Sequence, residues 1–184
     1  MELSIKALEV RKKIEQYQRS TEFLKLTETF AGNPDNVSGL VELVSSDEKH
    51  PFPQYSSHLL LHIARLNPLA LDPHYNKITD CLLTTANTSL KRNLLGVLLC
   101  FNLKEYKDGE ILDWLFDNLS KADSQPGLIN YSVRKLVQYI EIYPELKNEV
   151  ETAIKLREEL GMNRGLTEWS VMVFNKKAKT KKKA

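Results

Sequence analysis

Residues 89–101 read Ser-Leu-Lys-Arg-Asn-Leu-Leu-Gly-Val-Leu-Leu-Cys-Phe, and they contain the longest apolar run of the chain, residues 94–101. Leu90, Leu94 and Val97 recur every three or four positions, the spacing that places side chains on one face of an α-helix. As a helix, the apolar run covers about 12 Å, far less than the roughly 30 Å hydrocarbon core of a bilayer. The stretch therefore predicts a helix that buries one face in a protein core and does not cross a membrane.

The same helical spacing extends in both directions, and the links between helices carry cap residues. Asn33 before Pro34 is typical of a helix start, since Asn accepts hydrogen bonds from free N–H groups and Pro suits the first turn. Asp72 before Pro73 has the same pattern, and Ser89 is a further predicted cap. Seven Gly and seven Pro in 184 residues are few for a fold built on tight β-turns. We predict an all-α protein of about nine helices.

An internal repeat organises the predicted helices between residues 34 and 160. Three helices carry an apolar residue followed by others at +4 and often at +7 or +8, and they start at Tyr55, Leu90 and Val133. Each of the three is preceded by another amphipathic helix. The three starts lie 35 and 43 residues apart. A repeat of about 40 residues that is built from pairs of helices predicts an array in which each pair buries its apolar face against the next.

The sequence Ser132-Val133-Arg134, followed by apolar residues at 136, 137 and 140, resembles the second helix of a HEAT-like repeat. The resemblance implies a right-handed α–α superhelix of helical hairpins. The Asp that usually precedes this helix in the family is absent from the units that start at Leu90 and Val133, which puts the family's Asp–Arg ladder in doubt. A plain bundle of unequal helical hairpins is the alternative architecture.

We predict one helical-repeat domain over residues 1–165, with a helical N-terminal cap at 1–32 and HEAT-like hairpins at 34–160. Residues 166–174 are dense in large apolar side chains, and we expect them to cap the final helix because a repeat array exposes an apolar face at its end. A docking segment for a partner is the alternative. Residues 175–184 hold six lysines and no acid, a composition typical of a disordered tail.

Charged residues divide unevenly between the two helices of each predicted hairpin. The first helices are mainly acidic and the second helices mainly basic. Second helices usually line the concave surface of HEAT-like arrays, so the resemblance implies a basic inner face that attracts phosphates or an acidic protein segment. Two ordinary solvated faces are the alternative. The predicted binding groove comprises His58, His62, Arg65, Lys91, Arg92, Arg134 and Lys135.

From these features we predict a non-enzymatic scaffold that binds a protein or peptide partner through its concave face. Two cysteines fit a reducing, cytoplasmic setting. The alternative is a nucleic-acid-binding or DNA-alkylation-repair-like protein that uses the basic groove and the lysine tail. Residues expected to serve as partner contacts or caps are Trp114, Trp169 and Phe174. The tail lysines are Lys176, Lys177, Lys179, Lys181, Lys182 and Lys183.

The sequence contains no recognisable enzyme, cofactor or metal signature. Its seven glycines are scattered, so no phosphate-binding loop is predicted. His58 and His62 could reach one metal ion, but zinc needs at least a third protein ligand. Trp114 and Asp117 are residue types that the HEAT-like DNA-alkylation-repair glycosylases also use, at spacings that do not match. Asp117 is therefore the one candidate catalytic residue, and a surface carboxylate beside a packed Trp is the alternative.

Overall fold

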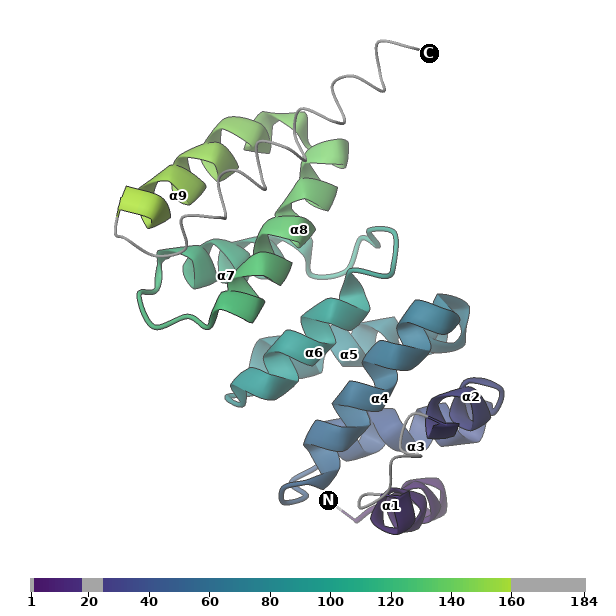
Figure 1. Ribbon diagram of the computed structural model, residues 1–184. Coiled ribbons are helices and arrows are strands. Elements are labelled where there is room, and N and C mark those ends of the chain that lie inside the picture. The colour runs from purple at the N-terminus through teal and green to yellow at the C-terminus, as the bar shows by residue number, and fades with distance from the viewer. Residues whose placement is uncertain (1, 18–24, 160–184) are drawn as a thin grey trace. The chain divides into compact units, whose positions relative to one another are not determined.

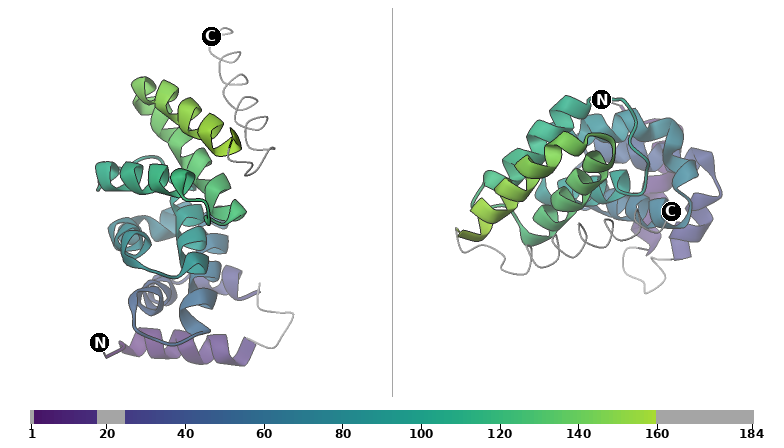
Figure 2. Two further views of the ribbon diagram at one scale, coloured as in Figure 1. Left: turned by 90° about the vertical axis from the view of Figure 1, so that its left-hand side faces the viewer. Right: turned by 90° about the horizontal axis from the view of Figure 1, so that it is seen from above.

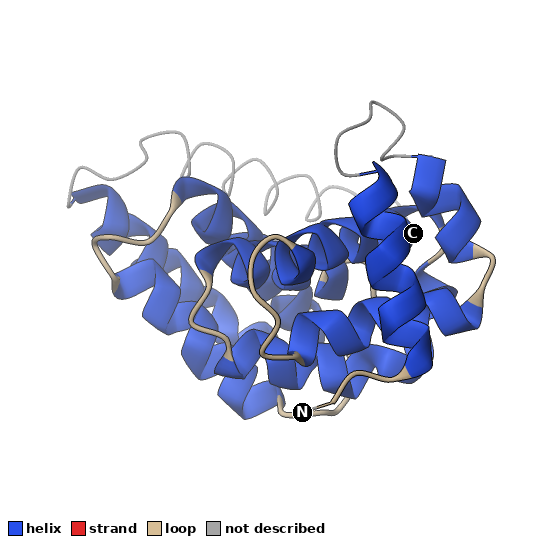
Figure 3. Cartoon of the chain, turned by 90° about the horizontal axis from the view of Figure 1, so that it is seen from below, coloured by secondary structure: helices blue, strands red, loops and turns tan. Residues whose placement is uncertain are grey.

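The computed structural model describes residues 2–17 and 25–159. Within these residues the chain forms nine α-helices and two short 3-10 helices, and Figure 3 shows that helices and loops account for all of this part. The prediction of an all-α helical-repeat fold is confirmed. No helix in the described ranges is both long and apolar enough to span a bilayer. The capping segment predicted at 166–174, with Trp169 and Phe174, and the lysine tail lie outside the described residues.

The chain divides into two compact units, with the boundary between Phe101 and Asn102. The single domain over residues 1–165 stays a prediction. The first unit contains α1 (Ile5–Tyr17), α2 (Lys25–Ala31), α3 (Pro34–Ser45), α4 (Phe52–Leu66), η1 (Pro68–His74), α5 (Tyr75–Thr84) and α6 (Thr88–Leu98). The second contains α7 (Asp108–Ser120), α8 (Pro126–Ile142), η2 (Pro144–Leu146) and α9 (Lys147–Glu159).

Two stacked hairpins form the centre of the first unit (Figure 1). Helix α3 pairs with α4, and α5 pairs with α6. Helix α3 also packs against α1 and α5, while α4 packs against α2 and α6. The first helices therefore form one layer and the second helices another. The apolar stripes found in the sequence lie between the layers, as the full burial of Leu59, Leu94 and Leu98 shows.

In the second unit, α7 and α8 form a hairpin and α9 packs against both (Figure 2). The side chains that face inward are completely buried and come from all three helices. They include Ile111 and Leu115 of α7, Leu136 of α8 and Val150 of α9. Helix α9 thus completes an apolar core that the hairpin alone would leave open on one side.

Helix starts follow the local cap chemistry, with two corrections to the sequence predictions. The Asn33 side chain accepts hydrogen bonds from two backbone N–H groups of α3, and Pro34 occupies its first turn as predicted. Asn87, rather than Ser89, caps α6, because its side-chain oxygen reaches the first free N–H groups of that helix. Asp72 does not start an α-helix. It lies inside the 3-10 helix η1, and α5 begins only at Tyr75.

A close approach holds α1 against α3. Gly39 lies where an added Cβ would be 2.8 Å from both the carbonyl oxygen of Lys6 and the Cγ2 of Val10. The Glu42 carboxylate accepts hydrogen bonds of 2.6 Å from the backbone N–H and from the hydroxyl of Ser4, the residue before α1. A glycine and a carboxylate on α3 therefore fix both the distance and the start of the first helix.

Candidate functional site

The histidine pair on α4 forms the centre of the candidate binding surface. His58 and His62 are one helical turn apart, and their Nε2 atoms lie 3.2 Å from each other. The rings meet edge to face, with centroids 4.5 Å apart, and both side chains are half-buried. At this distance one ring donates an N–H to the lone pair of the other. The pair can therefore hold one proton between its facing nitrogens.

The surroundings keep both rings neutral near pH 7. Burial lowers the pKa of His58, and the neighbouring His62 lowers it further. The positive charges of Arg92 and Arg65 act on His58 in the same direction. Burial also lowers the pKa of His62, followed by the charge of Arg65. Both imidazoles therefore lie beside permanent positive charge, supplied by exposed guanidinium groups on α4 and α6.

A buried hydrogen bond fixes the register that brings Arg92 close to His58. The Asn93 side-chain amide donates to the Ser57 hydroxyl oxygen across 3.0 Å, and that hydroxyl donates to the carbonyl of Gln54. Ser57 is fully buried and Asn93 is 5% exposed. These two residues are the chain neighbours of His58 and Arg92. The sequence analysis missed them, although polar residues on otherwise apolar helix faces were a usable signal.

The predicted groove residues of the first unit lie on two helices that pack against each other. His58, His62 and Arg65 lie on α4, and Lys91 and Arg92 lie near the start of α6, which packs against α4. We call these five residues the α4–α6 basic surface.

The two remaining groove residues belong to α8 in the second unit. Arg134 is exposed, and its guanidinium lies 5.9 Å from the centre of the Tyr131 ring. Lys135 is completely buried, so the prediction that it lines a solvent-facing groove is wrong. Ser132, Val133, Leu136, Val137 and Tyr139 on the same helix are buried as well. The Lys135 Nζ lies 5.9 Å from the centre of the Tyr139 ring.

A family model described as a HEAT repeat domain matches residues 10–177, which is most of the chain. The chain belongs to the HEAT repeat family. The resemblance drawn from the repeated helical pattern is confirmed by this match. No curated protein and no solved structure matches the chain, and the comparisons do not show a similarity to DNA-alkylation-repair proteins.

Several acidic residues on the first helices of the HEAT hairpins have structural partners. Asp35 lies 2.6 Å from the Lys6 ammonium, and Asp108 accepts a 2.9 Å hydrogen bond from the Tyr139 hydroxyl. Burial raises the pKa of Glu42, but the hydrogen bonds from Ser4 outweigh it and the net shift is downward. These carboxylates therefore connect helices within each unit as well as adding negative charge to the first helices.

The Trp114 and Asp117 pair has an ordinary surface arrangement. The Asp117 carboxylate is exposed and lies 3.0 Å from the Lys121 ammonium one turn later. Trp114 is half-buried on the same helix. Among residues 2–17 and 25–159, no group of three or more His, Cys, Asp or Glu side chains is placed to hold a metal ion.

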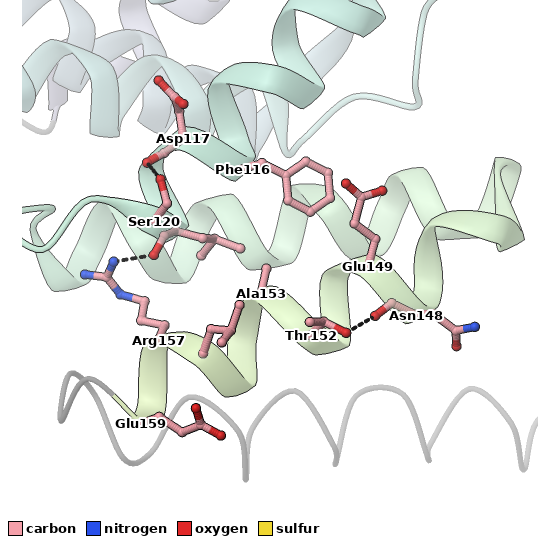
Figure 4. A pocket seen from close by; sticks show the side chains of 11 residues that line it. Phe116, Asp117, Ser120, Asn148, Glu149, Thr152, Ala153, Arg157 and Glu159 are labelled. Atoms are coloured by element: carbon pink, nitrogen blue, oxygen red, sulfur yellow. Dashed lines mark hydrogen bonds between the residues drawn. The ribbon is translucent and has the colours of Figure 1, made fainter.

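A groove lies between α7 and α9 in the second HEAT unit (Figure 4). It encloses about 820 Å³, and its apolar lining includes Phe116, Leu119, Ala153 and Leu156. Three carboxylates also line it, those of Asp117, Glu149 and Glu159.

Buried Arg157 closes one end of this groove. It is 2% exposed, and its Nη1 donates to the carbonyl oxygens of Leu119 and Lys121 at 2.6 and 2.8 Å. A longer bond of 3.4 Å reaches the carbonyl of Asn118. These acceptors lie at the C-terminal end of α7, so Arg157 joins α9 to that helix end.

Proposed function

We propose that this HEAT repeat protein is a non-enzymatic scaffold whose α4–α6 basic surface binds an acidic segment of a partner protein. The observation that supports the proposal most strongly is the convergence of the His58–His62 pair with Arg65 and Arg92 from two helices. Helical-repeat arrays present extended surfaces of this kind for binding. A guanidinium has a planar set of donors that matches a carboxylate, so two exposed arginines suit an acidic peptide.

The histidine pair couples the binding of an acidic segment to proton uptake. An anion bound beside His58 and His62 stabilises their protonated forms and so raises their pKa values. Because both rings are neutral at pH 7 without a ligand, binding takes up protons and strengthens as the pH falls toward 6. The direction follows from the lowered pKa values in the ligand-free protein.

The test uses the full chain and a fluorescein-labelled octa-glutamate peptide, with binding followed by fluorescence anisotropy at about 20 mM salt, where screening is weak. We expect the double variant Arg65→Glu/Arg92→Glu to bind at least about tenfold more weakly than the wild type. Its control is Lys147→Glu/Lys155→Glu, which makes the same change in net charge at exposed positions of the second unit that do not belong to the predicted groove. Equal loss in both variants would show general charge attraction and contradict the proposal.

Nucleic acid is the second candidate ligand, because the same cationic side chains also suit phosphates. A labelled DNA duplex is compared with octa-glutamate under the same conditions. Tighter binding to the duplex, lost in Arg65→Glu/Arg92→Glu and falling steeply with salt, would replace the acidic peptide by nucleic acid. Weak duplex binding that survives the double variant would leave the peptide as the ligand of the α4–α6 basic surface.

A further inference from the structure

We infer that the groove between α7 and α9 is the docking site of the chain's own residues 166–174. This segment lies outside the described residues, and its sequence is Leu-Thr-Glu-Trp-Ser-Val-Met-Val-Phe. The inference concerns the second unit and is independent of the α4–α6 basic surface. Three features of the groove and of the sequence support this occupant: apolar surface, charge and reach.

The groove exposes apolar surface that a segment rich in large apolar residues would cover. Leu156 on α9 is 56% exposed, and Phe116 and Ala153 are half-buried beside it. A volume of about 820 Å³ accommodates several large side chains but not a whole folded element. Residues 166–174 hold six large apolar side chains, among them Trp169 and Phe174. Burial of such side chains drives docking.

The charges of the groove and of the chain end are complementary. The apolar lining is flanked by three carboxylates, those of Asp117, Glu149 and Glu159. Asp117 also forms an ion pair with Lys121. Lys176 and Lys177 follow the apolar segment after the single residue Asn175, with further lysines after them. When the apolar residues occupy the groove, these ammonium groups come close to the acidic lining and are attracted to it.

The segment can reach the groove from the end of α9. Glu159 lines the groove and is also the last described residue. Leu166 is seven residues further along, and seven residues of fully extended chain reach at most about 25 Å. Helix α9, with 13 residues, is only about 20 Å long, so every part of the groove is within reach. The HEAT family match also runs through this segment, to residue 177.

The test follows Trp169 in the full chain labelled with 5-fluorotryptophan. The two tryptophans give two ¹⁹F signals, and the Trp169→Phe variant identifies the signal of Trp169. Docking predicts a Trp169 signal that is shifted from free fluorotryptophan and protected from a soluble paramagnetic reagent. We expect Leu156→Glu to lower the ratio of docked to undocked segment about tenfold, which corresponds to about 1.4 kcal/mol. The matched control is Leu66→Glu, at a leucine that is 62% exposed on α4.

A second variant leaves the groove untouched. Lys176→Glu/Lys177→Glu should also move the Trp169 signal toward the free position, because it reverses the charge complementarity. A wild-type Trp169 signal at the free position would overturn the inference and leave the groove open to another molecule. A protected signal that neither variant changes would place the segment elsewhere, and protection lost on dilution would identify a second copy as the binding partner.

Discussion

Replacement of Arg157 by methionine should lower the free energy of unfolding of the second unit by about 2–4 kcal/mol. The last carbonyls of a helix have no partner within the helix, and the negative end of its dipole lies there. Arg157 satisfies the carbonyl groups of Leu119 and Lys121 with short, charge-assisted hydrogen bonds. Methionine fills similar space but has no donor, so the Leu119 carbonyl would lose its bond from Arg157 and the Lys121 carbonyl would keep only the longer 3.3 Å bond from the Ser124 N–H.

The magnitude follows from the two short bonds. A hydrogen bond from a charged donor contributes about 1.5–3 kcal/mol, so two contribute about 3–6 kcal/mol. The weaker 3.4 Å contact to Asn118 adds little. Burial disfavours the charged guanidinium, as the lowered pKa of Arg157 shows, and methionine relieves that cost. The remaining net loss is the 2–4 kcal/mol expected above.

The assay is urea unfolding followed by tryptophan fluorescence, because both tryptophans of the chain belong to residues 102–184. Arg157→Lys should lose less than Arg157→Met, since one ammonium can still donate to one or two of the carbonyls. The control is Arg134→Met at an exposed position of α8, where we expect a change within about 0.5 kcal/mol. Equal stability of Arg157→Met and the wild type would refute the assignment of Arg157 as the link between α9 and α7.

Three further outcomes follow from the first unit. Gly39→Ala should destabilise it by about 1–2 kcal/mol in urea unfolding, because the clash with α1 exceeds the gain in helix propensity. Asn93→Ala should cost about 1–2 kcal/mol in the same assay, since the buried bond to Ser57 is lost. The lowered pKa values of His58 and His62 stabilise the fold above about pH 6.5, and this contribution is lost as the pH falls through their folded values. Urea unfolding at several pH values should show that the free energy of unfolding falls less toward acid pH in His58→Gln/His62→Gln than in the wild type.

The helices and several caps could be predicted because their signals are local. Leu90, Leu94 and Val97 are all buried on α6, as their spacing requires. Asn33 caps α3 through N–H groups two and three residues away, so a short window of sequence contains all of the chemistry. The 3-10 helix η1 was missed because Leu71 in this segment is fully buried, and its burial depends on packing that the local sequence does not contain.

The burial of Arg157 could not be predicted, because its partners are distant in the sequence. A lysine or arginine on an amphipathic helix normally indicates the solvated face. Arg157 is buried because the carbonyl end of α7, more than thirty residues earlier, faces it. Within the candidate site, the contact of His58 with His62 follows from helical spacing alone. The approach of Arg92 depends on how α6 is aligned with α4, which the Ser57–Asn93 bond sets.

Because Lys135 is buried, the rate at which its side chain is chemically labelled reports local opening of α8. An amine-reactive reagent modifies exposed lysines within its own reaction time, whereas a fully enclosed ammonium reacts only when the surrounding structure opens. The labelling rate of Lys135, read by mass spectrometry against an exposed lysine such as Lys155, therefore measures how often the helix is released from its neighbours. A feature that disqualifies Lys135 from a binding surface thus provides a native, single-site report of local unfolding.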